Sequence, residues 1–387
     1  MLNKNGERAL CYPVIIEEIL PIEGADNIAL ARVLGWHVIV KKTEFAVGDK
    51  AIYFEIDSKV PADDERFAFL EKKKYSIKTM KLNKFGVISQ GLLMPLSEFP
   101  EVGDPALDED LTQKLKVTYY EAEDNIRKAN PKINPYARMT NRHPKFFKAK
   151  IGKWMMKHEW SRKLLFFFLG RKKDKRGWPE WVSKTDEPRC QNEPWRFPGN
   201  SDQKWIVTEK IDGTSTTATY RKGRKYGFYI CSRNVVFDKP NKKCFYETNV
   251  YTEMAEKYRF EDVLKDLVSR YNLEWATIQG ETFGAGVQKR DYSMPCHDFY
   301  AFNLIFSDRG RLNSCTARDI LAQYNIPWVP ILDTNYVLPD TVDDMLTYAD
   351  GLSIVDGKMR EGVVLRSKDG KDSFKAVSNQ FLLKYHS

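Results

Sequence analysis

The feature that most constrains this chain is the string Thr208-Glu209-Lys210-Ile211-Asp212-Gly213-Thr214, which directly follows the apolar residues Trp205, Ile206 and Val207. Apolar β-type residues followed by Asp-Gly and a Thr/Ser run predict a strand that ends in a turn near Lys210. A lysine at such a strand end can attack a nucleotide α-phosphate and hold the nucleotide as a phosphoramidate. Taken alone, the K-x-D-G string is also compatible with an ordinary Lys-Asp turn in which glycine supplies a positive φ.

Three later segments have the composition expected of one shared site. They are Ile278-Gln279-Gly280-Glu281-Thr282-Phe283-Gly284, Arg360-Glu361-Gly362-Val363-Val364-Leu365-Arg366 and Ser373-Phe374-Lys375-Ala376-Val377. Each alone is compatible with a hairpin or a solvated strand end. In the order Lys-Asp-Gly, Gly-Glu, Glu-Gly, Lys, they resemble motifs I, III, IV and V of the covalent nucleotidyltransferases, which comprise DNA ligases, RNA ligases and mRNA capping enzymes.

Shorter matches narrow the resemblance. Cys231-Ser232-Arg233-Asn234 is similar to motif Ia, residues 298–304 are similar to motif IIIa, and residues 184–192 resemble a stretch that precedes motif I in RNA ligases. The region from about residue 178 to 387 is similar to the "RNA ligase 2" type. The best match is the subgroup of nick-sealing RNA ligases that carry an added N-terminal OB module.

DNA ligases and capping enzymes carry an OB domain after motif V. Here only residues 376–387 follow Lys375, and even a small domain needs about 50 residues. We therefore expect the RNA ligase branch. The alternatives are a DNA-joining or capping-type transferase, or a catalytically inactive RNA-binding relative.

The resemblance implies an adenylyltransferase whose nucleophile is Lys210. It implies ATP contacts from Glu209, Lys210, Arg189, Arg233, Glu281, Phe302, Glu361, Lys375 and Lys384. Phe302 would stack on the purine, Arg233 would contact the ribose or phosphates, and the backbone near Glu209 would read the base edge. The acids Asp212, Glu281 and Glu361 would hold Mg²⁺ or Mn²⁺, because hard carboxylates with retained waters suit these ions.

One position departs from the family pattern. Many relatives have K-x-K in motif V, whereas Val377 stands at the second place here. Lys384 could supply the missing cation, and it could equally be a solvated terminal lysine.

The first hundred residues predict short strands over 12–19, 28–40, 50–56 and 86–96, with turn residues between them. This spacing favours a small barrel but does not distinguish an OB barrel from others. Residues 77–92 resemble the OB module of the RNA ligase subgroup. That resemblance implies RNA backbone contacts from Lys78, Lys81, Lys84 and Gln90, which could equally be ordinary exposed residues of a β-ribbon.

Charge is unevenly distributed along the chain, whose net charge is +9. Residues 127–176 contain seventeen basic and two acidic residues, with aromatic residues interleaved. Lys and Arg neutralise phosphates and aromatic rings stack on bases, so we favour a nucleic-acid surface. The alternative is a helical connector whose aromatic residues pack inward and whose charges are only solvated.

The polar start of the chain and its short apolar runs lead us to expect neither a signal peptide nor a membrane span. The six cysteines are scattered without a C-x-x-C pair, which favours reduced cysteines in a cytoplasmic or nuclear protein.

Together these observations predict an α+β protein. We expect an OB-type barrel over residues 1–110, a basic helical connector over 111–177, and a nucleotidyltransferase domain with antiparallel sheets over 178–387. The predicted activity is ATP-dependent sealing of RNA 3′-hydroxyl and 5′-phosphate ends at nicks, by a monomer. Because ATP chemistry needs only the motifs from Lys210 to Lys375, we also expect deletion of residues 1–110 to leave self-adenylylation largely intact and to impair sealing.

Overall fold

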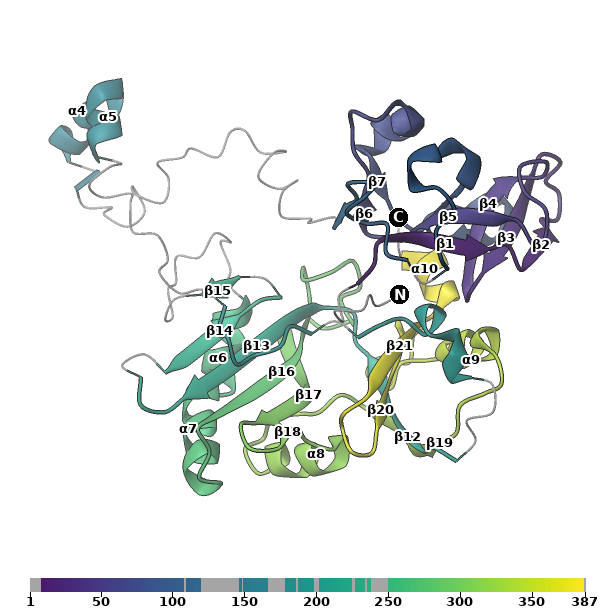
Figure 1. The fold of residues 1–387 in the computed structure, drawn as a ribbon. Coiled ribbons are helices and arrows are strands. Elements are labelled where there is room, and N and C mark those ends of the chain that lie inside the picture. The colour runs from purple at the N-terminus through teal and green to yellow at the C-terminus, as the bar shows by residue number, and fades with distance from the viewer. Residues whose placement is uncertain are drawn as a thin grey trace. The chain divides into compact units, whose positions relative to one another are not determined.

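The computed structural model describes residues 8–107, 109–119, 146–147, 149–165, 178–185, 187–197, 202–224, 227–233, 235–237 and 250–385. Short strands dominate these residues and helices are few (Figure 1). Every pair of named strands is antiparallel. The predicted α+β class with antiparallel sheets is therefore confirmed.

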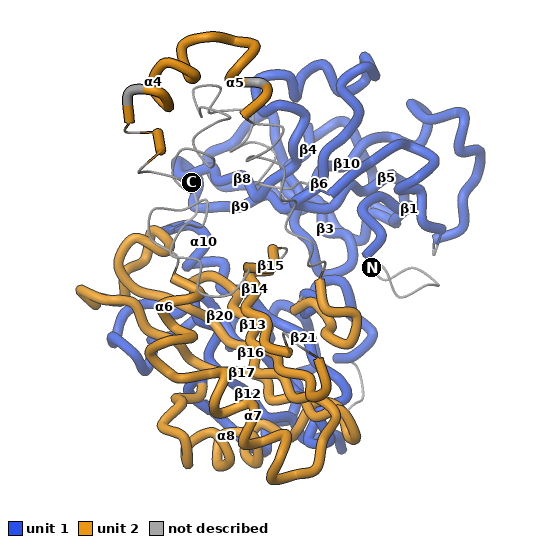
Figure 2. The backbone as a smooth tube through the Cα atoms, turned by 90° about the vertical axis from the view of Figure 1, so that its left-hand side faces the viewer, with its two compact units in different colours: residues 1–120, 186–212, 329–387 blue, residues 121–185, 213–328 orange. Residues whose placement is uncertain are grey.

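The chain divides into two compact units, drawn in blue and orange in Figure 2. Unit 1 comprises residues 1–120, 186–212 and 329–387, and unit 2 comprises residues 121–185 and 213–328. The N-terminal strands thus share a unit with two later stretches of the chain. The predicted domain boundaries at residues 110 and 177 stay a prediction.

The N-terminal part of unit 1 is built from short strands. They are β1 (Cys11–Ile15), β2 (Glu18–Pro21), β3 (Ile28–Val33), β4 (Trp36–Lys41), β5 (Lys50–Phe54), β6 (Ser58–Lys59), β7 (Ser76–Ile77), β8 (Met80–Leu82), β9 (Val87–Ser89), β10 (Leu92–Pro95) and β11 (Thr118–Tyr119). They pair in the orders β1-β5-β10, β2-β3-β4, β11-β6-β7 and β8-β9. A single-turn or longer 3₁₀ helix follows several of them, the longest being η1 (Glu65–Lys73).

The sheet β1-β5-β10 is buried on both faces. Tyr12 and Tyr53 belong to one core cluster, whereas Cys11 and Phe54 belong to another. Successive side chains of a strand point to opposite faces, so one sheet separates the two cores. We call this N-terminal part of unit 1, residues 8–119, the barrel.

Three predicted strands of the barrel are interrupted. The stretch 12–19 is divided between β1, which ends at Ile15, and β2, which begins at Glu18 in another sheet. The expected strand over 28–40 is wrong as a single element: it is the hairpin β3–β4, which reverses at Leu34 with φ 53° and at Gly35. The stretch 86–96 likewise breaks at Gly91, where φ is +105°. A residue with positive φ ends a strand. The apolar pattern continues on both sides of each turn, so it did not indicate where the chain reverses.

The rest of unit 1 is a four-stranded sheet in the order β19-β12-β20-β21. Its strands are β12 (Trp205–Lys210), β19 (Ile331–Tyr336), β20 (Gly362–Ser367) and β21 (Ser373–Val377), accompanied by helices α9 (Val342–Ala349) and α10 (Asn379–Tyr385). One face of this sheet packs against α9, with Val207, Leu365 and Phe374 in the same buried cluster as Met345.

Unit 2 contains a six-stranded sheet in the order β15-β14-β13-β16-β17-β18. Its strands are β13 (Thr214–Arg221), β14 (Phe228–Cys231), β15 (Val236–Phe237), β16 (Trp275–Gly284), β17 (His297–Phe306) and β18 (Gly310–Arg311), and its helices are α4 (Lys150–Lys157), α5 (Glu159–Leu165), α6 (Val250–Lys257), α7 (Phe260–Arg270) and α8 (Ser314–Ala322). Buried residues of α7, such as Leu264 and Leu267, place this helix against β13 and β16.

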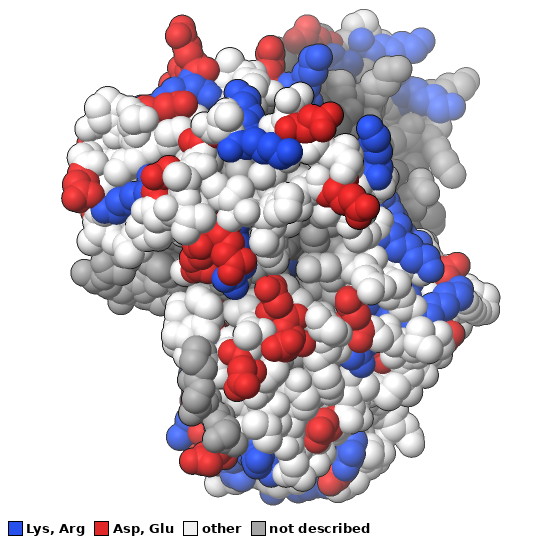
Figure 3. Space-filling model, turned by 90° about the vertical axis from the view of Figure 1, so that its right-hand side faces the viewer, with Lys and Arg blue, Asp and Glu red and all other residues white. Residues whose placement is uncertain are grey.

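One side of unit 1 concentrates acidic side chains. Figure 3 shows Asp and Glu gathered on the face seen from the right-hand side of Figure 1, where β2 and α9 lie. Glu17 and Glu18 at the start of β2 and Asp343 of α9 are exposed, and Arg32 pairs with the two glutamates at 3.8 and 2.6 Å. Since an acidic surface repels phosphate, this side of unit 1 is a poor nucleic-acid surface.

Several sequence expectations can be compared with the described residues. Most of the basic segment 127–176 lies outside them. Helices α4 and α5 fall within it and expose Trp154 and Trp160. The five described cysteines are free. None of the described helices is long and apolar enough to cross a bilayer.

Candidate active site

Lys210 is the last residue of β12, the strand whose end the sequence predicted. β12 lies between β19 and β20, and its register pairs Lys210 with Gly362. The residue before Gly362 is Glu361, so the antiparallel pairing brings the two charged residues together. Lys210 Nζ lies 2.6 Å from Glu361 Oε2, and this carboxylate side chain is only 10% exposed. The amine is therefore held in one position by a largely buried charge.

Lys375 lies on the same face of this sheet. Thr208 pairs with Val364, and Val364 pairs with Lys375. Directly opposed residues share a face, as do residues two apart along a strand. Thr208, Lys210 and Lys375 therefore point to one side, while Val207, Leu365 and Phe374 occupy the apolar core on the other. The site face thus presents both Lys210, with Glu361 beside it, and Lys375.

Glu209 alternates to the opposite face from Lys210. It is 1% exposed, and its Oε2 accepts a hydrogen bond from the backbone N–H of Ile354 at 2.9 Å. Its own backbone N–H donates to Pro330 O at 2.9 Å. Glu209 thereby ties β12 to the two loops beside it, which fixes the strand that presents Lys210.

Arg189 lies on a segment that extends the sheet beyond β21. Lys375 N–H donates to Pro188 O at 2.8 Å, and Arg189 forms a parallel bridge with Lys375. The half-buried Arg189 guanidinium has a buried Nη1 that finds no hydrogen-bond partner among the described residues. A buried donor without a partner is costly, so it indicates a place where an acceptor binds.

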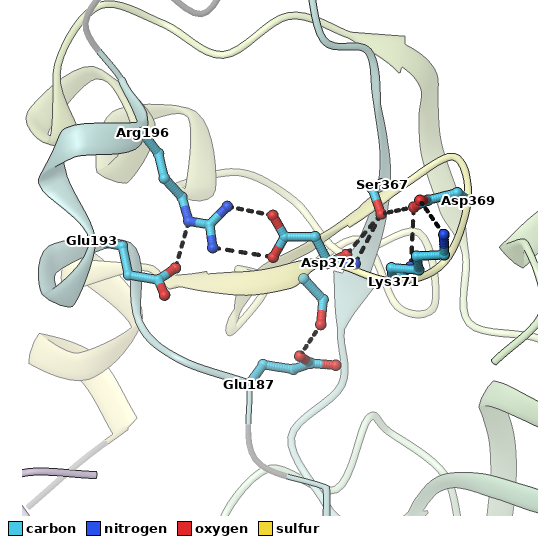
Figure 4. Close-up of polar contacts among 8 residues, drawn as sticks. Glu187, Glu193, Arg196, Ser367, Asp369, Lys371 and Asp372 are labelled. Carbon is cyan, nitrogen blue, oxygen red and sulfur yellow. Dashed lines mark hydrogen bonds and ion pairs between the residues drawn. The ribbon is translucent and has the colours of Figure 1, made fainter. Parts of the chain in front are cut away.

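Ion pairs fasten this segment to the β20–β21 hairpin (Figure 4). Arg196 makes two hydrogen bonds to the Asp372 carboxylate at 2.5 and 3.1 Å and one to Glu193 at 2.6 Å. Ser373 donates a hydrogen bond to Glu187. A bidentate Arg–carboxylate pair has a defined geometry, so residues 187–196 are held against the strand that carries Lys375.

Arg366 is a residue of the site face that the sequence reasoning did not select. It is 3% exposed, and its guanidinium donates to Thr208 Oγ1 at 3.2 Å and to Glu187 at 3.5 Å. Its position two residues after Val364 on β20 places it on the face of Lys210. The sequence did offer a way to select Arg366: it lies within an apolar strand, and an arginine is rarely buried there without a partner.

The unit boundary falls directly after Asp212, which is half-buried. Gly213 opens unit 2, and it lacks the positive φ that the alternative of an ordinary Lys-Asp turn would require. A Cβ there would lie 2.3 Å from Thr282 O and 2.9 Å from Glu281 Cγ. The glycine of the K-x-D-G string is therefore required by the close approach of β16, the strand that carries Glu281.

Phe302 occupies an irregularity in β17. Gln279 pairs with Asn303 and Gly280 pairs with Ala301, so Phe302 is the extra residue of a β-bulge. Bulges re-aim a side chain and occur next to active sites. The ring is half-buried, which leaves part of it available for stacking.

Residues 181–185 run along one face of the unit 2 sheet. Trp181 donates to Thr219 at 3.1 Å, Gln279 donates to Ser183 O at 2.9 Å, and Thr185 bonds to Ser215 at 2.8 Å. Gln279 also accepts a bond from Asn303 at 2.9 Å. Because Ser215 pairs with Glu281, this polar network surrounds the strand position of the predicted acid.

The remaining predicted site residues are placed as follows. Arg233 is exposed after β14, Glu281 is half-buried on β16, and Lys384 is exposed on α10. Among the described residues, no group of three or more His, Cys, Asp and Glu side chains is arranged to hold a metal ion. The metal assignment of Asp212, Glu281 and Glu361 therefore stays a prediction.

The four residues predicted to contact RNA differ in exposure. Lys78 and Lys84 are exposed. Lys81 is half-buried and donates to Leu383 O on α10 at 2.8 Å. Gln90 is buried; its backbone N–H donates to His37 O, and its backbone carbonyl accepts a bond from Tyr53. Lys78 and Lys84 are thus the two exposed residues of this set.

Comparison with known families assigns both parts of the chain. A family model described as an OB-fold domain matches residues 14–96, and one described as RNA ligase matches residues 203–386. No curated protein sequence matches the chain significantly.

Solved structures resemble the whole chain. An RNA ligase from Naegleria gruberi with PPi is 28% identical, with a TM-score of 0.72, over 97% of this chain and 98% of that one. A lysine-to-methionine mutant of the same ligase with AMP and Mn is 28% identical at a TM-score of 0.73, over 98% and 99% of the two chains. A lysine-to-alanine mutant with ATP and Mn is also 28% identical at a TM-score of 0.73, over 97% and 99%.

Proposed function

Residues 203–386 belong to the RNA ligase family and follow an OB-fold domain, and from this premise we propose that the protein is an ATP-dependent RNA ligase. It would join a 3′-hydroxyl to a 5′-phosphate at nicks, through a lysyl-AMP and an RNA-adenylate intermediate. The observation that carries this proposal is the pairing of Lys210 with Glu361 at 2.6 Å on the sheet face that also holds Lys375.

The variants of the Naegleria ligase support the choice of residues. In that protein a lysine, the aspartate two positions after it and an arginine 21 positions before it were each changed to alanine. Arg189, Lys210 and Asp212 have the same spacing here. The ligase was solved with ATP, AMP, PPi and Mn. These ligands favour ATP as the nucleotide of the present chain.

Three transfers would complete the reaction. First, Lys210 Nζ attacks the α-phosphorus of ATP, a P–N bond forms, and the bond to pyrophosphate breaks. Second, an RNA 5′-phosphate oxygen attacks the same phosphorus and releases the lysine. Third, a 3′-hydroxyl attacks the 5′-phosphorus, loses its proton, and expels AMP. Lys375 and Arg189 would stabilise charge that develops on the phosphate oxygens.

A divalent cation fits the donor chemistry of the site. Carboxylates of Asp212, Glu281 and Glu361 would hold Mg²⁺ or Mn²⁺ together with retained waters. The largely buried Glu361 carboxylate beside Lys210 is the donor on which this fit rests. When bound, the cation would supply positive charge at the triphosphate and favour the neutral form of the amine.

The substrate we propose is RNA, as a nicked duplex. Lys78 and Lys84 of the barrel would contact its backbone through charge, and the protein would act as an intracellular monomer. A 2′-hydroxyl contact on the 3′-hydroxyl strand would distinguish RNA from DNA.

The covalent step provides the decisive test. The protein is incubated with α-labelled ATP or GTP and Mg²⁺ or Mn²⁺, and then separated on a denaturing gel. We expect an acid-labile AMP adduct in the wild type and none in Lys210→Ala or Lys210→Arg, since a guanidinium stays protonated and is no nucleophile. An adduct of unchanged intensity in Lys210→Ala would refute the assignment.

Substrate choice is tested separately. Matched nicks with RNA or DNA on the 3′-hydroxyl side are supplied to the full-length protein. We expect sealing of the RNA nick and slower sealing of the DNA nick. Equal rates would contradict RNA specificity while leaving the adenylylation step intact.

A further inference from the structure

The barrel contacts the ligase part of unit 1 through the β3–β4 turn. Trp36 begins β4, is completely buried, and stacks on Tyr53 with ring centroids 6.1 Å apart. Its indole N–H donates to Asn192 Oδ1 at 2.9 Å. One tryptophan therefore belongs to the barrel core and also bonds to the segment that carries Arg189.

Gly35 makes this contact possible. Its N–H donates to Gln191 O at 3.4 Å. A Cβ at Gly35 would lie 2.8 Å from Gln191 Cα and 2.7 Å from a Val342 side-chain carbon. Real Cβ atoms do not approach other atoms this closely, so an alanine here would push the β3–β4 turn away from residues 190–192.

Trp36 also faces Arg189 itself. The guanidinium carbon of Arg189 lies 5.9 Å from the centroid of the Trp36 ring. This is within range of a cation–π attraction, which orients the cation over the ring. Arg189 is thus placed from one side by the barrel and from the other by its backbone pairing with Lys375.

A second contact reaches the end of the same sheet. Ile88 of β9 packs with Val377 and Leu382, and Lys81 bonds to Leu383 O at 2.8 Å. Val377, Leu382 and Leu383 follow Lys375, and the two leucines belong to α10, the helix that carries Lys384. The barrel therefore contacts both chain segments that leave Lys375 and Arg189.

We propose that Trp36 is a positioning residue for the nucleotide site: the barrel holds Arg189 in place through Trp36 and Gly35. This inference rests on the proposed function. It replaces the expectation that the barrel is dispensable for self-adenylylation, because the barrel supplies part of the surroundings of a nucleotide-site arginine.

The test measures the rate of AMP-adduct formation against ATP concentration in full-length variants. Trp36→Phe removes the indole donor, Gly35→Ala displaces the turn, and Asn192→Ala removes the acceptor from the ligase side without altering the barrel. We expect each to raise the KM for ATP about tenfold, the size of one lost orienting interaction. The maximal rate should change less, because Lys210 and Glu361 are untouched.

Gly48→Ala is the matched control. Gly48 lies in the barrel with φ +92°, and an added methyl group there meets nothing within 4 Å. This variant should lower the melting temperature of the protein through backbone strain while leaving the KM for ATP within about twofold. If Gly35→Ala and Gly48→Ala alter the melting temperature and the KM alike, the barrel stabilises the fold only and the proposal fails.

Cys190 provides a readout that does not depend on activity. Its thiol is buried beside Arg189, and burial raises its pKa to about 12. We expect alkylation of Cys190 to accelerate at least about fivefold in Gly35→Ala and Asn192→Ala, and to stay at the wild-type rate in Gly48→Ala. Wild-type labelling in Gly35→Ala would overturn the contact. Absence of an adduct in the wild type would instead refute the proposed function.

Discussion

The central sheets of both units contain buried polar side chains, but these side chains are paired in different ways. In unit 1, the site face of β12 and β20 carries charges that are paired: Lys210 with Glu361 and Arg366 with Glu187. In unit 2, β13 and β16 carry buried threonines that pair hydroxyl to hydroxyl, with Thr216 to Thr282 and Thr219 to Thr277 each at 2.7 Å.

This difference in pairing indicates that the two sheets have different roles: one is suited to react with a substrate and the other to support the site. A charged pair at low exposure creates a strong local field and is expensive to break, because the remaining charge is left uncompensated. A neutral hydroxyl pair rigidifies a sheet without such a field. Replacing both hydroxyls by apolar groups of the same shape changes the free energy of unfolding little. The unit 1 sheet is therefore suited to act on phosphates, whereas the unit 2 sheet is suited to hold Glu281 and Phe302 at defined positions.

The largest expected effect concerns the two acids. Glu361→Gln keeps the shape of the side chain and removes the charge beside Lys210, so adduct formation should fall at least about 100-fold. Glu281→Gln should also slow adduct formation, but by a smaller factor, since its strand position belongs to the supporting sheet. Single-turnover labelling with ATP measures both.

Glu193→Gln serves as a control, because that carboxylate pairs with Arg196 and not with Lys210. If Glu281→Gln were the more damaging of the two site substitutions, the division between an acting and a supporting sheet would be wrong.

The next effect is on stability. Arg366→Met leaves Glu187 without its guanidinium neighbour and Thr208 without its donor, which should cost about 2–3 kcal/mol. Asp372→Asn breaks a more exposed pair, whose Arg196 and Asp372 side chains are 19% and 40% exposed, and leaves Arg196 bonded to Glu193; it should cost about 1 kcal/mol or less. Urea unfolding of both variants gives the comparison, and equal losses would show that burial does not govern the unit 1 charges.

The threonine pairs should respond differently. Thr216→Val should cost about 1–2 kcal/mol by leaving the Thr282 hydroxyl buried without its partner. The double variant Thr216→Val/Thr282→Val should cost less than the sum of the two single variants. A double-mutant cycle in urea measures this coupling, and strict additivity would contradict a direct interaction between the hydroxyls.

The smallest effect is a pH dependence in the barrel. Burial lowers the pKa of His37 below its ordinary value, and Arg32 lowers it further, while Asp343 and Glu18 oppose this. A histidine with a depressed pKa contributes stability above its unfolded pKa of about 6.5, and this stability is lost as the pH falls through the folded pKa.

His37→Gln should therefore flatten the loss of stability between about pH 7 and about pH 5. Melting temperatures over this range test the point, with His158→Gln on the exposed end of α4 as the comparison. An unchanged pH profile in His37→Gln would exclude a role for this imidazole.

Much of the site could be read from residue order. The strand before Lys210 and the apolar strand after Glu361 were predicted, because an alternating or continuous apolar run indicates a strand from neighbouring residues alone. Their register could not be predicted: only antiparallel pairing of Lys210 with Gly362 places the amine beside Glu361. The alternative in which Gly213 supplies a positive φ in a turn is wrong, because the neighbouring strand, not the local backbone, requires this glycine.

The sequence by itself determined the classes of chemistry and fold: a lysine at a strand end, acids at later strand ends, and an N-terminal set of short strands. Only the tertiary structure decided that Trp36 lies against Arg189, 153 positions later, and that Glu209 faces away from Lys210. The physical reason is the distance along the chain over which each interaction acts. Periodicity and turn chemistry act between neighbours in the chain, whereas packing, register and close approach depend on segments that meet only after folding.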